Sequence, residues 1–158
     1  MRGSKIKNLA SKIKHIYETD NPLEILDMRG VKVLELELDD DMDYFEGAYI
    51  SNKGLNMVIY NKNLKRFRKK LVLWHETGHN IIHGDYNINS ITKNISVVSN
   101  REELEADIFA AEAIIDDDVF LDYVKVYRYT DSQIASDLNI PLKFVRLKYQ
   151  NFDKSKLL

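Results

Sequence analysis

The sequence predicts an α+β fold, and three observations predict it. Apolar residues recur at helical spacing in segments near both ends of the chain. Three β-rich runs lie together between residues 31 and 60. Capping and turn-forming residues separate these segments, as the boundaries of short elements require. The length of 158 residues suits one domain with its own hydrophobic core.

Composition excludes several classes of protein. The chain carries 23 basic and 25 acidic residues, so its net charge of −2 gives no reason to expect a nucleic-acid or membrane surface. It has no cysteine, which excludes disulfides and thiolate metal sites. No apolar run approaches the roughly 20 residues of a membrane span, and lysines interrupt residues 5–14, where a signal peptide would be apolar. We therefore expect a cytoplasmic protein without a membrane segment.

The first 30 residues predict two helices. Residues 4–18 read as an amphipathic helix, with apolar side chains at Ile6, Leu9, Ile13, Ile16 and Tyr17. Asn21 is a capping residue directly before Pro22, and this pair is typical of a helix start. The second helix is expected to end near Met28, before Gly30.

Residues 31–60 predict the strands. Residues 31–38 alternate between apolar and polar side chains, apart from a slip in phase at Leu34. The aspartates at 39, 40, 41 and 43 read as a solvated turn, because a calcium loop would need alternating oxygen ligands, a central glycine and a terminal glutamate. Residues 45–50 and 55–60 predict a hairpin around the turn 51–54.

A long helix is predicted from Leu64, capped by Asn63, to His83, with Gly84 as its stop. Within it, His75 and His79 are four residues apart and therefore share one face, where two imidazoles can bind one zinc ion.

The catalytic base is predicted next to the first histidine. Glu76 lies about 100° further around the helix, where it can act as general base on a water without binding the metal. The alternative is a surface helix with two histidines and a solvated glutamate. Against it, His75 and His79 lie inside the apolar stripe of the helix, beside Leu71.

The third ligand is predicted on the next helix. After an irregular connection over residues 85–99, the capping box formed by Ser99 and Glu102 starts this helix. Its apolar arc comprises Leu104, Ala106, Ile108, Ala110, Ala111, Ala113, Ile114 and Ile115, while Arg101, Glu105 and Glu112 take the opposite side. Glu103 and Asp107 lie within the apolar arc, where a carboxylate is costly unless it is paired or bound to metal.

Glu103 therefore completes a predicted set of two histidines and one glutamate, with the fourth position left for water. Asp107 is expected to accept the far N–H of a ligating histidine. The alternative is that both acids pair with basic residues of another helix. His83 is a rival ligand, but it does not fit the longer metzincin motif, and we prefer it as a wall of the cleft.

At this point the sequence resembles the ImmA/IrrE metallopeptidase family. The resemblance covers most of the chain from about residue 55, and it is carried by Asn61, the segment His75-Glu76-Thr77-Gly78-His79 with His83, the segment 103–111, and the segment 134–141 with Val145. Two departures are Thr77, where leucine is common, and the acidic residues 116–118, where the family often has an apolar residue and proline.

The resemblance implies a zincin-like domain with a small sheet packed on the active-site helix and a helical C-terminal part. Zinc would be held by His75, His79 and Glu103, with Glu76 as the catalytic base. It also implies a protein substrate, since members carried by phages and mobile elements act as anti-repressors that cleave a helix-turn-helix repressor. We expect residues 1–128 to form the metallopeptidase domain and residues 129–158 to form a helical extension packed on it.

The end of the chain has a second interpretation. After a helix expected over residues 117–127, residues 130–146 have the rhythm of a helix-turn-helix, in which Lys143, Arg146 and Lys148 would face phosphates. Two short packing helices are the favoured interpretation, because the basic surface is thin. We therefore do not expect direct nucleic-acid binding.

The function predicted is a zinc-dependent endopeptidase. The candidates for stabilising the oxyanion or lining the cleft are His83, Tyr86, Tyr123, Tyr127 and Tyr129. The alternative function is a non-catalytic regulator whose zincin-like domain binds a repressor or DNA. Replacing Glu76 by Gln separates the two, because only a peptidase needs this carboxylate.

Overall fold

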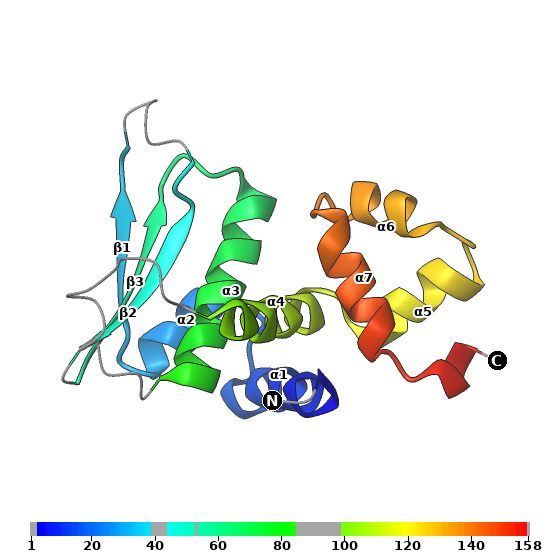
Figure 1. The fold of residues 1–158 in the computed structure, drawn as a ribbon, viewed down its shortest axis with the longest axis horizontal. Coiled ribbons are helices and arrows are strands. Elements are labelled where there is room, and N and C mark those ends of the chain that lie inside the picture. Colours follow the sequence, from blue (N-terminus) through cyan, green and yellow to red (C-terminus); the bar gives the residue numbers. More distant parts are fainter. Residues whose placement is uncertain (1–2, 39–43, 53, 85–98, 158) are drawn as a thin grey trace.

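The computed structural model describes residues 3–38, 44–52, 54–84 and 99–157 and has an α+β fold (Figure 1). The first half contains α1 (Gly3–Tyr17), α2 (Pro22–Met28), β1 (Lys32–Leu36), β2 (Gly47–Asn52), β3 (Leu55–Asn61) and α3 (Arg66–His83). The second half is helical, with α4 (Asn100–Ile114), α5 (Asp117–Lys125), α6 (Asp131–Asp137), α7 (Leu142–Asn151) and the 3-10 helix η3 (Lys154–Leu157). The predicted fold class is confirmed. Figure 1 shows the sheet on one side of α3 and helices α5 to α7 on the other.

The sheet has three strands in the order β1-β3-β2. β3 is central, with Val58 opposite Val33 of the parallel strand β1 and opposite Tyr49 of the antiparallel strand β2. The predicted hairpin is confirmed, but its turn is shorter than expected, because Ser51 and Asn52 belong to β2. Residues of β3 and of the α2–β1 region form a small core with α3, comprising Leu26, Val31, Val58, Tyr60 and Leu73.

Local capping by side chains explains where α2, α4 and α6 begin. Asn21 caps α2, with Pro22 in the first turn, and Gly30 follows the helix at a φ of 69°. Ser99 forms the predicted capping box of α4, and Thr130 forms a second one at α6. These starts agree with the sequence prediction.

The start of α3 differs from the prediction. The helix begins at Arg66 rather than Leu64, and its capping position is Lys65, whose side chain makes no capping bond. Asn63 does not cap it, because it lies two residues before the capping position. Its backbone N–H donates to the side chain of Asn61 at 2.9 Å. The buried amide of Asn61 also donates to the Phe45 carbonyl at 3.2 Å. These two bonds hold a turn between β3 and α3.

The main core surrounds α4, which packs against α1, α3 and α7. Trp74 of α3 and Phe109 of α4 are fully buried, with ring centroids 6.1 Å apart. Because three helices cover α4, its polar side was predicted incorrectly. Glu105 and Glu112 are each only 7% exposed, whereas Leu104 of the predicted apolar arc is 48% exposed.

The C-terminal helices pack onto this same core. Ile134 of α6, Phe144 and Val145 of α7, and Phe152 beyond it are buried in it. α6 packs on α7, and α7 packs on α4. This is the packing role favoured for these helices, while the division of the chain at residue 128 stays a prediction.

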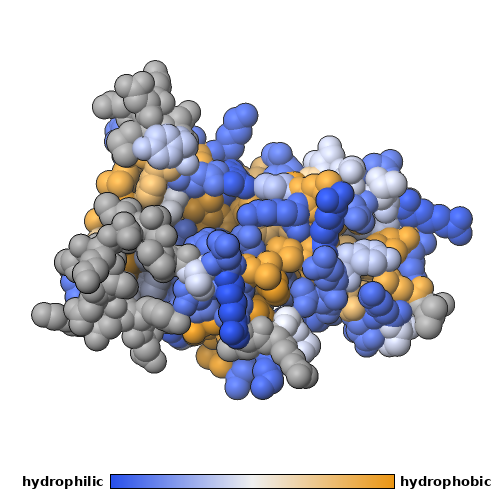
Figure 2. Space-filling model, viewed as in Figure 1, coloured by the Kyte–Doolittle hydropathy of each residue, from blue (hydrophilic) through white to orange (hydrophobic). Residues whose placement is uncertain are grey.

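Some expectations lie outside the described residues, namely the acidic turn over residues 39–43, most of the irregular connection over residues 85–99, and Tyr86. Among the helices that are described, none combines the length and the apolar character that crossing a membrane requires. On the face viewed in Figure 2, hydrophilic side chains cover much of the surface and hydrophobic ones show between them.

Candidate metal centre

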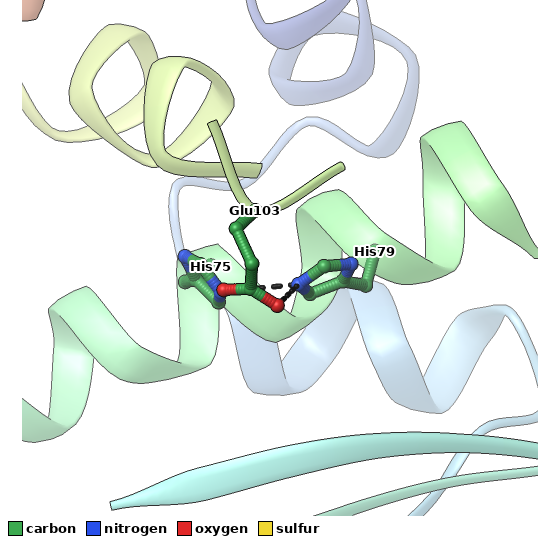
Figure 3. Close-up of side chains that lie close together, drawn as sticks. All are labelled: His75, His79 and Glu103. Carbon is green, nitrogen blue, oxygen red and sulfur yellow. Dashed lines mark hydrogen bonds and ion pairs between the residues drawn. The ribbon is translucent and has the colours of Figure 1, made fainter. Parts of the chain in front are cut away.

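Two helices bring three potential ligands together. His75 and His79 lie one turn apart on α3, and Glu103 reaches toward both imidazoles from α4 (Figure 3). The two Nε2 atoms are 3.1 Å apart. Glu103 places Oε2 at 3.3 Å from Nε2 of His75 and Oε1 at 3.4 Å from Nε2 of His79. The predicted set of two imidazoles and one carboxylate therefore converges on one point.

These separations fit a single metal ion. Ligand atoms at about 2.0–2.1 Å from a tetrahedral zinc lie roughly 3.4 Å from one another. The two Nε2 atoms are 3.1 Å apart, and each has a different oxygen of the Glu103 carboxylate at 3.3 or 3.4 Å, so these separations are of the size that one ion requires. One potential ligand atom from each residue can be chosen so that all three lie within 4.8 Å of one another. Among the described residues, His75, His79 and Glu103 form the group of histidine and acidic side chains that could hold a metal ion. The side chain of Glu103 is half-buried, so solvent reaches the cluster from its side.

Glycine lets the two helices approach closely enough. A Cβ added at Gly78 of α3 would lie 3.2 Å from the Cβ of Phe109 and 3.3 Å from the Cα of Ala106 on α4. A side chain at this position would push α4 outward and carry Glu103 with it. The glycine inside the His-x-x-x-His spacing thus has a packing reason.

Asp107 lies where the sequence predicted it. Its Oδ1 is 3.0 Å from Nδ1 of His75, on the side of the ring away from the cluster. Its Oδ2 accepts from Nζ of Lys143 on α7 at 2.9 Å. A carboxylate on Nδ1 keeps the proton on that nitrogen and leaves the Nε2 lone pair for a metal. Asp107 is thus paired both with a ligand and with a basic residue of another helix.

Electrostatics in the metal-free cluster favour a protonated imidazole. Burial by itself lowers the pKa of His75, but hydrogen bonds to Asp107 and Glu103 outweigh it and raise the pKa to about 9. The same hydrogen bonds from His75 and His79 hold the pKa of Glu103 well below its usual range. The site is therefore suited to a cation. Without metal, the positive charge beside the carboxylates is that of the protonated His75 imidazole.

Glu76 is positioned by the sheet as well as by its own helix. It is only 6% exposed, and burial raises the pKa of its carboxyl against the opposing effect of the two histidines. The backbone N–H of Tyr49 on β2 donates to this carboxylate. Gly47 makes that approach feasible, because a Cβ there would lie 2.6 Å from Cγ1 of Val72 and 3.4 Å from Oε1 of Glu76.

Comparison with known proteins agrees with this geometry. A family model described as the IrrE N-terminal-like domain matches residues 26–149. The chain belongs to the ImmA/IrrE family. It is 27% identical over 143 residues to a Bacillus phage phi105 protein called uncharacterized immunity region protein 2, covering 90% of this chain and 88% of that one. It is 24% identical over 139 residues to metallopeptidase ImmA of Bacillus subtilis strain 168, covering 86% and 79%.

Membership in the ImmA/IrrE family implies a divalent metal, and His75, His79 and Glu103 are the residues that could hold it. The departure from the family pattern at Thr77 is accommodated inside α3. Thr77 is fully buried, and its hydroxyl donates to the Leu73 carbonyl one turn earlier at 2.7 Å. This substitution leaves the ligand face unchanged.

His83 lies beside the cluster without joining it. Its ring centroid is 5.5 Å from that of His79, and its Nε2 is 3.8 Å from the buried carboxylate of Glu105. Burial, together with His79, lowers the pKa of His83. His83 also lines a polar pocket of about 320 Å³ with Arg29 and Asn80.

The predicted tyrosines gather elsewhere. Tyr123, Tyr127 and Tyr129 form a ring cluster in and just after α5, with centroids 5.7–6.1 Å apart. The hydroxyl of Tyr123 bonds to Asp137 of α6, which raises the pKa of the phenol to about 12. The structure does not bring these three residues to the metal cluster.

Three groups beside the candidate metal centre were not indicated by the sequence. They are Gly47, the backbone N–H of Tyr49 and Lys143. A glycine opening a β-rich run could have signalled close backbone approach. The cost of burying Asp107 called for a cation, but the sequence did not indicate which one.

Proposed function

We propose that the protein is a zinc-dependent endopeptidase that cleaves a protein substrate. The observation that carries this proposal is the convergence of His75, His79 and Glu103 beside the buried carboxylate of Glu76. Two imidazoles and one carboxylate form a ligand set of catalytic zinc sites, which keep a position open. Zinc bound there would supply Lewis acidity and lower the pKa of a water to about 7.

The residues of the chain then have distinct roles. Glu76 takes a proton from the attacking water and later returns it to the leaving amine. Burial raises the pKa of Glu76 above that of an exposed glutamate, which makes it a stronger base toward the attacking water. The backbone N–H of Tyr49 favours the charged form of this carboxylate. Among the described oxyanion candidates, His83 is the one whose ring contacts a metal ligand, so we assign it the lining of the cleft.

β2 supplies a route for the substrate backbone. In the described sheet β2 pairs only with β3, and its residues Gly47 and Tyr49 lie against the helix that carries Glu76. An extended peptide can add to an open strand edge through main-chain hydrogen bonds. We infer that the substrate binds in this way, with its scissile bond beside Glu76.

The substrate proposed is a helix-turn-helix repressor of a phage or mobile element. Two findings support this. The sequence resembles a family whose mobile-element members cleave such repressors, and a similar protein of Bacillus phage phi105 is called an immunity region protein. Cleavage would release the genes that the repressor silences.

The test is co-expression with a helix-turn-helix repressor from the genome that encodes this protein. We expect repressor fragments with the wild type and none with Glu76→Gln, which keeps the side-chain volume but removes the base. Glu24→Gln, on the exposed surface of α2, is the matched control and leaves cleavage intact. An intact repressor with wild-type protein that has been shown to contain zinc contradicts the proposed substrate.

The alternative function is a non-catalytic regulator that binds a repressor or DNA. The ion pairs of α7 argue against DNA binding, because they engage two of the three basic residues. Lys143 bonds Asp107, and the buried Lys148 bonds Glu112 and Asp117. Only Arg146 remains of the basic trio proposed to face phosphates. Biological activity that survives in Glu76→Gln would favour the non-catalytic regulator over the peptidase.

A further inference from the structure

Lys143 of α7 reaches the metal centre through Asp107. The two oxygens of this carboxylate have different partners, since Oδ1 is 3.0 Å from Nδ1 of His75 and Oδ2 is 2.9 Å from Nζ of Lys143. The three groups therefore form a chain from the C-terminal helices to a ligand. Lys143 also lies over the ring of the buried Phe144 at 4.7 Å, which restricts its side chain further.

A second ion pair fixes the register of this contact. Lys148 is only 1% exposed, and its Nζ lies 2.7 Å from Oε2 of Glu112. Glu112 follows Asp107 by five residues on α4, just as Lys148 follows Lys143 by five residues on α7. The two ion pairs are therefore separated by the same number of residues on α4 and α7. The buried Lys148–Glu112 pair keeps Lys143 opposite Asp107.

We propose that Lys143 is a positioning residue for the metal centre. By holding one oxygen of Asp107, it orients the other toward Nδ1 of His75, so that Nε2 of His75 stays directed at Glu103. This inference rests on the proposed zinc site, and it assigns the C-terminal helices a role in that site. The side chain of Lys143 is 58% exposed, but that of Asp107 is only 15% exposed and is also bonded to His75. This shared carboxylate distinguishes the contact from an ordinary surface ion pair, which contributes little.

The first test measures zinc affinity by competition with a chromophoric chelator. Direct partners of metal ligands typically change affinity 10–100-fold, so for this more distant residue we expect Lys143→Met to weaken binding about three- to tenfold. Lys143→Arg should restore it, because the guanidinium can still bond the carboxylate. Arg146→Met is the matched control, since it removes an exposed charge from the same helix, and it should stay within about twofold of wild type.

The sign of the change separates positioning from charge. If Lys143 acted only as a nearby positive charge, removing it would tighten the binding of a cation. Unchanged or tighter binding by Lys143→Met therefore overturns the inference. In an Asp107→Asn background, Lys143→Met should have no further effect, because the residue through which it acts no longer carries a carboxylate.

A second measurement follows His75 itself by NMR of the zinc-loaded protein. The Nδ1 proton should be seen downfield and exchange slowly in wild type and Arg146→Met, and it should exchange faster in Lys143→Met. Equal exchange in all three proteins overturns the inference while leaving the proposed function intact. Failure of the wild type to bind zinc at all would instead remove the proposed function together with this inference.

Discussion

At the scale of single residues, the candidate metal centre is a set of acidic and imidazole side chains in direct contact. Glu103 contacts both His75 and His79, and Asp107 contacts the far side of His75. These acids raise the pKa of His75 to about 9 despite its burial, so without metal both ring nitrogens are protonated at neutral pH. Metal binding must therefore release that proton.

This release predicts a pH dependence of zinc affinity. Because the proton leaves a group with a pKa of about 9, apparent affinity should rise about tenfold per pH unit below 9 and level off above it. Competition titrations across this range measure the slope. Asp107→Asn removes the largest cause that raises the pKa of His75, so its plateau should begin at lower pH. Zinc affinity that stays constant between pH 7 and pH 9 would contradict this account of the site.

The residues of the candidate metal centre could be predicted from the sequence for physical reasons. Four-residue spacing fixes His75 and His79 on one face, and the cost of burying carboxylates singled out Glu103 and Asp107. Lys143 was not predicted to contact the centre, because its partner lies 36 residues away on another helix. A helical wheel has no information about which helix packs beside it.

At the scale of elements, two glycines set the distances across the site. Gly78 brings α4 close to α3, and Gly47 brings β2 close to α3 beside Glu76. Neither has a positive φ, so each is required for space rather than for backbone conformation. The sheet and α4 thus pack closely against α3 at these two glycines.

Gly47→Ala tests the β2 contact. The added Cβ would lie 2.6 Å from Cγ1 of Val72, so we expect overpacking to lower the free energy of unfolding by about 1–3 kcal/mol and to reduce cleavage. Val72→Ala removes that methyl, and the double variant should lose less than the sum of the single losses. Chemical denaturation gives these values. Strict additivity of the two substitutions would show that the contact does not limit the approach of β2.

Elements were predictable where the signal is local. The capping residues Asn21, Ser99 and Thr130 start helices, as the sequence indicated. Asn63 failed as a cap because Asn61 forms a competing turn with it. The prediction of which side of α4 faces solvent was wrong, because Glu105 and Glu112 face other helices rather than water.

At the scale of the whole molecule, α4 connects the metal centre to the C-terminal helices. Its first turns carry Glu103 and Asp107, and its last turn carries Glu112, which pairs with Lys148. Lys148 also bonds Asp117, and Asp117 bonds Lys7 of α1. Helices α1, α4, α5 and α7 are therefore joined by one network of charges around a single buried ammonium group.

Lys148→Met tests this network. This substitution leaves the buried Glu112 without the ammonium group of Lys148. Burial raises the pKa of the Glu112 carboxyl even when Lys148 is present and opposes that shift. Breaking such a buried pair costs about 3–5 kcal/mol of unfolding free energy. Lys148→Met with Glu112→Leu should recover most of the loss, because no buried charge is then left unpaired at that position. A single variant as stable as wild type in urea denaturation would contradict the structural role of the network.

We propose that α3 and α4 together bind one zinc ion beside Glu76. The most direct measurement is anomalous diffraction at the zinc edge from crystals of the zinc-loaded protein. We expect one strong peak at about 2.0–2.1 Å from Nε2 of His75, Nε2 of His79 and an oxygen of Glu103. A peak away from these atoms, or no peak in a protein saturated with zinc, would contradict it.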